Sequence, residues 1–385
     1  MKKLKFLTAG ESHGKGLIGI LEGLPAGLEI AEKFINQQLT RRQRGHGRGK
    51  RMEIEHDQAE IYSGVRFGKT LGSPIALIVK NRDWENWSRK MAVDGSGENV
   101  KKVTLPRPGH ADLAGAQKFD FDDIRNVLER SSARETAMRV ALASLARKLL
   151  HIVGITVGSR VVQIHEVKDE TIPDRELDLD KLNAQADASP LRCLDKATEK
   201  AMVAAIDQAQ AEGDSVGGVF EVLATGLPYG LGSYTHWDRK LTTRLSAAIM
   251  SINAIKGVEI GRGFASAESM GSQTHDEISW DEATYQRATN NAGGLEGGMT
   301  NTQPLVLRAV MKPIPTLMKP LRSVDMLTKV DKSAHKERTD VCAVPAASIV
   351  AESMVCLVLA DALLEKFGGD TVDQLKDHMK MSARY

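Results

Sequence analysis

The chain has 385 residues, of which 42% are hydrophobic and 26% are charged, and these fractions exclude disordered and collagen-like classes. The formal net charge is only +2, whereas a protein that lives on nucleic acid usually carries a clear basic excess, so any anion recognition must be local. Cys193, Cys342 and Cys356 lack metal-type spacing, and an odd number makes no disulfide framework. No apolar run is long enough for a signal peptide or membrane helix, so we expect a cytoplasmic protein.

The first part of the chain predicts short strands, one helix and a basic loop. Apolar runs between glycine turns predict strands over 17–21, 58–63 and 75–79. Residues 30–42 predict an amphipathic helix that runs into a glycine-rich basic loop, RRQRGHGRGKR, at 41–51. Residues 83–99 are polar and broken by glycine and serine, which predicts a loop.

The clearest helix prediction covers residues 132–149. Ser132 and Glu135 match a capping box, and apolar residues then recur at helical spacing. Residues 241–255 and 345–367 predict two further helices. The last one is apolar nearly all round, which indicates full burial in a protein core rather than a membrane span.

The remaining pattern favours an α+β fold in one domain, 1–385. Residues 169–214 are polar and predict a peripheral helical excursion, and strands are expected over 217–223, 258–263 and 305–311. Strands and helices do not alternate steadily, which argues against a doubly wound parallel sheet. Neither a dinucleotide-binding glycine turn nor a Walker loop appears between a strand and a helix.

Two histidines lie in open, rigid turns. His13 in GESHG and His110 in RPGHAD each follow glycine or small residues, which offer little for a core histidine to pack against. Their ordinary titration near neutrality suits a general acid. An exposed turn histidine is an equal reading of GESHG alone, but two such turns in one chain make that reading weaker.

The basic loop at 41–51 has three readings. Its arginines could grip phosphate or carboxylate groups, with glycines folding the loop over the ligand. It could be a solvated basic loop, or an RNA-binding module, although it lacks interleaved aromatic residues for base stacking.

Four other segments point to anions or polar ligands. ERSSARETAMR at 129–139 places hydroxyls and arginines at a helix start, where the helix dipole favours an anion. NNAGGLEGGMTNTQ at 290–303 suits close backbone approach to a flat polar ligand, or is a long turn. KPIPT at 312–316 is stiffened by proline. In ERTDVCAVP, Asp340 is either a proton acceptor or a structural partner of Arg338. No metal-site spacing occurs.

Together these motifs resemble the chorismate synthase family over nearly the whole chain. The landmarks, in order, are GESHG, RPGHAD, RSSARET at 130–136, SINAIKG at 251–257, the glycine pair near Gly297 and R-x-D before the last helix. The resemblance implies a β-α-β sandwich with a central layer of apolar helices between antiparallel sheets. It further implies a homotetramer that acts on a small anionic substrate and uses neither nucleic acid nor membrane.

The implied enzyme is a carbon–oxygen lyase of aromatic amino-acid biosynthesis, the shikimate pathway. It converts 5-enolpyruvylshikimate-3-phosphate to chorismate and phosphate by a 1,4-anti elimination that has no net redox change but requires reduced FMN (FMNH2). The implied catalytic residues are His13, which protonates the departing phosphate, His110, which donates to the flavin, and Asp340, which helps remove a proton. The implied substrate-binding residues are Arg42, Arg48, Arg107, Arg134 and Arg338.

The resemblance also implies the residues that contact FMN. These are Arg130, Ser131, Ser132, Asn253, Ala254, Gly297, Lys312, Pro313, Ile314, Pro315, Thr316 and Arg338. Arg42 and Arg48 match positions that the family associates with NADP. The alternative enzyme reading is therefore an NAD(P)H-dependent flavin reductase, with NADPH as the reductant. Otherwise a separate reductase supplies the reduced flavin.

Overall fold

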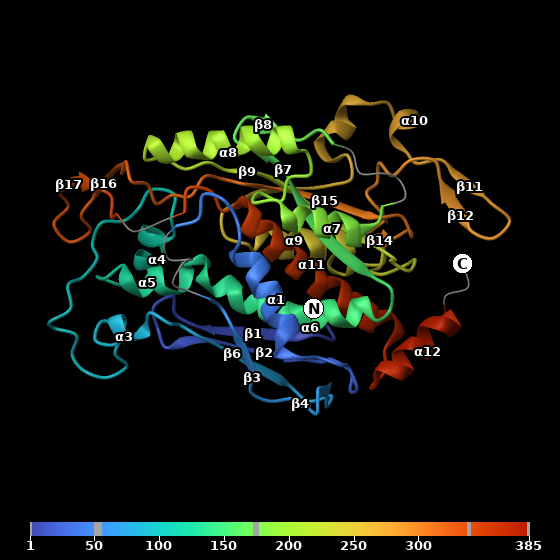
Figure 1. The fold of residues 1–385 in the computed structure, drawn as a ribbon, viewed down its shortest axis with the longest axis horizontal. Coiled ribbons are helices and arrows are strands. Elements are labelled where there is room, and N and C mark those ends of the chain that lie inside the picture. The colour runs from blue at the N-terminus through green and yellow to red at the C-terminus, as the bar shows by residue number, and fades with distance from the viewer. Residues whose placement is uncertain (1, 50–55, 172–176, 337–339, 383–385) are drawn as a thin grey trace.

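A computed structural model describes residues 2–49, 56–171, 177–336 and 340–382. They form three layers, with a sheet on each side of a layer of helices (Figure 1). The first sheet contains β1 (Lys5–Gly10), β2 (Gly16–Glu22), β6 (Ile75–Lys80) and β3 (Ala59–Ile61), in the order β1-β2-β6-β3. All its pairs are antiparallel, with Leu17 opposite Val79. Burial alternates along β2, so one face of this sheet lies on the core.

The second sheet is also antiparallel and has the order β10-β15-β9-β7-β8. Its strands are β10 (Ile255–Ile260), β15 (Leu305–Met311), β9 (Gly218–Thr225), β7 (Thr156–Ile164) and β8 (Val167–Lys168). The antiparallel sheets on either side of apolar helices confirm the predicted α+β sandwich.

The central layer contains α1 (Glu32–Gln43), α6 (Thr136–His151), α9 (Leu241–Met250) and α11 (Val344–Phe367). Of the helices described, α11 is long and apolar enough to cross a membrane, but its apolar window is 100% buried inside the protein. The predicted burial of this helix is therefore confirmed. Its start at Pro345 fits the preference of proline for a first helical turn, where its missing N–H has no partner to lose.

The other elements join these layers. Segment 169–214 contains α7 (Leu179–Ala188) and α8 (Lys196–Ala211); α7 packs on β7, and Met202 and Ile206 of α8 enter the main core. The remaining helices and strands are β4 (Val65–Arg66), β5 (Lys69–Thr70), α3 (Trp84–Trp87), α4 (Asp112–Phe119), α5 (Arg125–Ser131), α10 (Gly271–Thr274), β11 (Ile278–Trp280), β12 (Tyr285–Arg287), β13 (Leu295–Glu296), β14 (Met299–Thr300), β16 (Arg322–Val324), β17 (Asp331–Ser333) and α12 (Val372–Ser382).

Several predicted boundaries were wrong. The helix expected over 241–255 ends at Met250, and the next strand begins at Ile255 rather than 258. The short sequence Ile-Asn-Ala-Ile at 252–255 fits either state, and the turn at Ala254, with φ of +66°, separates the two elements. The loop predicted over 83–99 contains the short helix α3.

The capping box predicted at Ser132 and Glu135 does not form. Ser132 Oγ accepts the backbone N–H of Arg134, but Glu135 pairs with Arg139 at 2.7 Å. The backbone N–H of Ser132 donates to Leu128 O at 3.1 Å instead, because Ser132 follows directly on α5. The predicted helix start is therefore one 3-10 turn, and α6 begins at Thr136.

Candidate active site

A cavity of about 820 Å³ lies where the turn after β1, the last turn of α1, the start of α6 and the residues after α9 and β15 meet. It is bordered on one side by the first turns of α11. The structure places most of the predicted site residues around this one cavity. The predicted residues that line it are His13, Arg42, Arg48, Arg107, His110, Ser131, Ser132, Arg134, Asn253, Ala254, Lys312, Ile314, Pro315, Thr316 and Asp340.

His13 is held by a buried carboxylate. Its backbone N–H donates to Glu129 Oε2 at 2.7 Å, and its Nδ1 lies 3.0 Å from Glu129 Oε1. Burial by itself would raise the pKa of Glu129, but hydrogen bonds from His13 and the charge of Arg125 lower it below its usual value. An ionised carboxylate only accepts hydrogen bonds, so Nδ1 of His13 carries a proton.

An indole ring covers one face of His13. The rings of His13 and Trp87 stack with their centroids 3.9 Å apart and an interplanar angle of 28°. Trp87 Nε1 donates to Asp83 Oδ2 at 2.9 Å, which fixes the indole within α3. Arg125 lies over the same ring, 5.1 Å from its centroid, and also pairs with Glu129 at 3.3 Å. The imidazole is therefore fixed both in its plane and perpendicular to it.

His110 has a similar arrangement in the RPGHAD turn. Its Nδ1 hydrogen-bonds Asp112 Oδ1, and Arg107 Nε donates to Asp112 Oδ2 at 2.9 Å. Burial would raise the pKa of Asp112, but the hydrogen bonds from His110 and Arg107 lower it strongly, so this carboxylate stays ionised. Arg107 Nη1 also donates to Thr316 Oγ1 at 2.7 Å, which joins this turn to the segment after β15.

Arg42 and Arg134 share a carboxylate that is remote in sequence. Arg134 pairs with Asp57 Oδ1, and Arg42 Nη1 lies 3.6 Å from Asp57 Oδ2. Asn81 Oδ1 accepts from Arg134 Nη2 at 2.8 Å, while Asn81 Nδ2 donates to three carbonyl oxygens of the His13 turn. Burial and the neighbouring cations lower the pKa of Arg42 to about 10, even though Asp57 opposes this shift. The arginines and the His13 turn thus form one rigid unit.

The basic loop folds inward rather than into solvent. Arg48 Nη1 pairs with Asp340 Oδ2 at 2.9 Å, and the backbone N–H of Gly49 donates to Asp340 Oδ1 at 2.6 Å. Gly47 has φ of +78°, and a Cβ there would lie 2.8 Å from Ile206, so the loop packs tightly on α8. Arg338, the structural partner that the sequence suggested for Asp340, lies outside the described residues. Residues 50–51, at the end of the basic loop, also lie outside them.

The segments after α9 and β15 contribute a polar wall. Asn253 Nδ2 donates to Ser131 O at 3.0 Å. Lys312 Nζ donates to Gly109 O at 2.5 Å, and the backbone N–H of Lys312 donates to Ala254 O. These bonds connect the SINAIKG, RPGHAD and KPIPT segments.

Three predicted cofactor-binding residues are not brought to this cavity in the described chain. Arg130 Nη2 instead donates to Thr8 O at 2.8 Å, and Pro313 is absent from the lining. Gly297 lies in the β13–β14 hairpin, and the neighbouring Gly298 O accepts the backbone N–H of Leu241 at the start of α9. Asn253 follows the opposite end of that ten-residue helix, so about 15 Å separates the two regions.

Sequence reasoning missed the residues that support the site. Asp57, Asn81, Arg125 and Trp87 hold its cations and histidines, and His335 and Lys336 also line the cavity. Asp57 and Asn81 follow no motif and lie 77 and 53 residues from Arg134. Asp112 lies two residues after His110 in the same motif, and this spacing is the signal that could have found it, whereas Glu129 lies in a quoted motif but 116 residues from His13.

Comparisons with known proteins identify the family of the chain. The family model described as chorismate synthase matches residues 4–364. The chain is 54% identical over 383 residues to the chorismate synthase of Bacillus subtilis, covering 98% of each chain. It is 55% identical over 383 residues to that of Aquifex aeolicus, covering 98% of this chain and 96% of the relative. A solved structure titled as a crystal structure of chorismate synthase matches with a TM-score of 0.81 and 44% identity, covering 100% of this chain and 98% of that one. The chain therefore belongs to the chorismate synthase family and is a carbon–oxygen lyase.

Proposed function

We propose that the cavity converts 5-enolpyruvylshikimate-3-phosphate to chorismate and inorganic phosphate with reduced FMN as cofactor. The observation that carries this proposal is the convergence of two carboxylate-bound histidines and four arginines on one cavity. In the elimination, the bond between carbon and the phosphate oxygen breaks, a proton leaves the ring, and a double bond forms. The site must therefore hold three anionic groups and supply and accept protons.

The arginines are suited to binding the substrate. Arg42, Arg48, Arg107 and Arg134 are anchored by carboxylates, so their guanidinium groups are in place before a ligand arrives. Arg42 Nη1 is buried and has no hydrogen-bond acceptor among the described residues, which leaves it a donor to offer. Each charged hydrogen bond contributes about 1.5–3 kcal/mol, so losing one should weaken binding about tenfold to a hundredfold.

The histidines are suited to proton transfer. Glu129 accepts a hydrogen bond from His13 Nδ1, which orients the ring so that His13 can protonate the departing phosphate from Nε2. Asp112 does the same at Nδ1 of His110. Asp340, between Arg48 and the backbone N–H of Gly49, is the proposed proton acceptor.

The chain's own residues fit a flavin. Asn253 Oδ1 is buried and accepts no hydrogen bond from any described residue, so it is available to an N–H donor on a ligand. Lys312 and the hydroxyls of Ser131, Ser132 and Thr316 suit a phosphate or a polar ring edge. When bound, FMN supplies electron density transiently and recovers it, so the overall reaction has no net redox change.

One experiment separates this function from the alternative, an NADPH-dependent flavin reductase. We expect anaerobic turnover with dithionite-reduced FMN to yield chorismate and phosphate in equal amounts. If only NADPH oxidation with oxidised FMN is seen, and no chorismate forms from reduced FMN, the proposed lyase function is wrong. If both occur, the chain reduces its own flavin through Arg42 and Arg48; if only the first occurs, a separate reductase supplies it.

We also propose a cytoplasmic homotetramer. The outward face of the first sheet carries Leu7, Ile18 and Ile20, which are 70%, 49% and 42% exposed, and Leu7 is paired with Ile20 in the register. A contiguous apolar sheet face of this kind is typical of a subunit interface. Light scattering on the purified chain tests the assembly, and Ile18→Lys should lower the mass if this face is an interface.

A further inference from the structure

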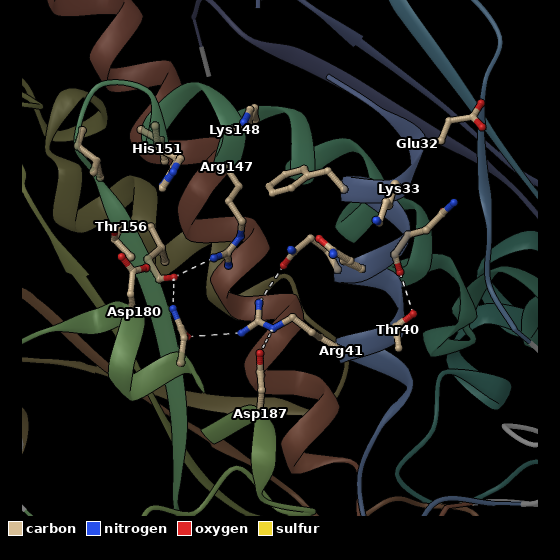
Figure 2. A pocket seen from close by; sticks show the side chains of 18 of the residues that line it. Glu32, Lys33, Thr40, Arg41, Arg147, Lys148, His151, Thr156, Asp180 and Asp187 are labelled. Carbon is tan, nitrogen blue, oxygen red and sulfur yellow. Dashed lines mark hydrogen bonds and ion pairs between the residues drawn. The ribbon is translucent and has the colours of Figure 1, made fainter. Parts of the chain in front are cut away.

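A second cavity, of about 920 Å³, shares no lining residue with the first. It lies between α1, the last turns of α6, the start of β7 and α7 (Figure 2). Figure 2 shows Arg41 from α1 and Arg147 from α6 converging on its floor, with Lys148 and His151 on the wall above them. None of the chemistry proposed above uses this space.

The cavity floor is a fixed cationic surface. Glu352, fully buried in α11, accepts from Arg41 Nη1 at 2.9 Å and from Arg192 Nη2 at 3.0 Å, and it also pairs with Arg147. Burial alone would raise the pKa of Glu352, but the three arginines lower it to about 2. Asp187 also pairs with Arg41, at 2.8 Å. Three guanidinium groups therefore face two carboxylates, and a positive charge remains.

Several basic side chains that line this cavity have no partner among the described residues. Within the described chain, the side chains of Lys33, Arg44, Lys148 and His151 form no ion pair or hydrogen bond, although Lys148 lies 5.7 Å from the ring centroid of Phe34. Five lysines and arginines line the cavity against three carboxylates, and one of these, Glu32, accepts the backbone N–H of Ile61 at 2.8 Å. A concave site with an excess of one charge concentrates ligands of the opposite charge.

We propose that this cavity is an effector site for a small polyanion, a phosphorylated or polycarboxylic metabolite. Lys33, Lys148 and Arg44 would provide the direct charged contacts, because Arg41 and Arg147 are already committed to Glu352. The guanidinium groups of Arg41 and Arg147 are already fixed, so they supply a positive potential without losing side-chain entropy when the ligand binds.

The effector site is connected to the active site through α1 and α6. Arg41 and Arg42 are consecutive residues in the last turn of α1, one facing each cavity. Arg42 Nη2 donates to Thr136 Oγ1 at 2.9 Å, and Thr136 begins the same helix, α6, that carries Lys148 near its end. An anion that shifts the last turn of α1 therefore changes the position of Arg42. This coupling rests on the proposed function, and by linkage the substrate must alter effector affinity equally.

Calorimetric titration of the full chain with inorganic pyrophosphate, without flavin, tests the site independently of turnover. We expect two binding events, one per cavity. Lys33→Gln with Lys148→Gln should weaken one event at least tenfold, while the exposed Lys200→Gln, a loss of one charge outside both cavities, leaves both unchanged. Arg48→Gln should weaken only the other event. A single event, or a second event that depends on Arg48 and not on the two lysines, overturns the site.

The effector role is tested by turnover. Pyrophosphate competes with substrate at the active site in every variant, so the double lysine variant measures competition alone. We expect the wild-type chain to show an additional change in KM that the double variant lacks, with kcat unchanged. Identical pyrophosphate dependence in the two proteins overturns the effector role, even if calorimetry detects the second event. Circular dichroism checks that the double variant is folded.

Discussion

Replacing Glu129 by glutamine tests the role of His13 most directly. Glutamine keeps the size of the side chain and can still accept a hydrogen bond, but it removes the negative charge next to the imidazole. The carboxylate accepts from the backbone N–H and Nδ1 of His13 and pairs with Arg125. The substitution therefore removes charge without leaving a cavity.

The expected loss follows from these contacts. A charge-assisted hydrogen bond contributes about 1.5–3 kcal/mol, and a neutral one about 0.5–1.5 kcal/mol. The difference of roughly 1–2 kcal/mol corresponds to a fivefold to thirtyfold decrease in kcat. Because the carboxylate acts through His13, the decrease should appear in the pH profile of kcat.

The assay is anaerobic chorismate formation with dithionite-reduced FMN between pH 6 and about 9, a range that spans ordinary histidine titration. Glu166→Gln, on an exposed turn after β7, is the matched control and should change neither kcat nor the profile. A merely structural role for Glu129 would lower the amount of folded enzyme without moving the pH profile. An unchanged profile with full kcat in Glu129→Gln would refute our assignment of His13 as the acid.

Three further predictions concern other buried polar groups. Asp112→Asn should lower kcat by a similar factor through His110, measured in the same assay, and should leave the thermal midpoint within a few degrees. Asn253→Ala should weaken FMN binding about tenfold, measured by quenching of flavin fluorescence, because it removes the anchor to Ser131 and the free acceptor. Glu352→Gln should destabilise the chain by about 3–5 kcal/mol in urea at pH 7, because it removes the buried carboxylate that three arginines share. In the wild-type chain, the pKa of Glu352 lies near 2, below its unfolded value of about 4.3. Its contribution to stability is therefore complete above that unfolded value and lost as pH falls toward 2, and Glu352→Gln should flatten this decline.

The elements that sequence predicted well are those whose burial repeats along the chain. β15 occupies the predicted residues 305–311, and α11 begins within one residue of its prediction, because alternating burial along β15 and nearly continuous burial along α11 leave clear apolar patterns. The errors lie where local patterns are ambiguous. The mixed pattern at 251–255 is compatible with either helix or strand, and the turn there depends on tertiary contacts such as Asn253 with Ser131.

The candidate site was predictable as a set of motifs, but its geometry was not. The motif histidines and most of the arginines do reach one cavity, since each motif places its functional side chain in a short turn between elements. Asp57, Asn81 and Trp87 carry no local signal, because their importance comes from partners distant in sequence. The second cavity was not predicted from the sequence either. Arg41 was interpreted as part of the basic loop, whereas its guanidinium pairs with Glu352 of α11.

The near-neutral composition and the cationic site have one physical explanation. Every buried cation described in the active site is held by a carboxylate, as Arg134 is by Asp57 and Arg107 by Asp112, since an isolated buried charge is very costly. Because each cation is paired with a carboxylate, the site adds little to the net charge of the chain. The same pairing fixes each guanidinium before the ligand arrives. A substrate with three anionic groups then meets donors that need little reorganisation, and this preorganisation, rather than net charge, is the expected source of its binding. If that is correct, neutralising Asp57 should weaken substrate binding even though it makes the cavity more positive.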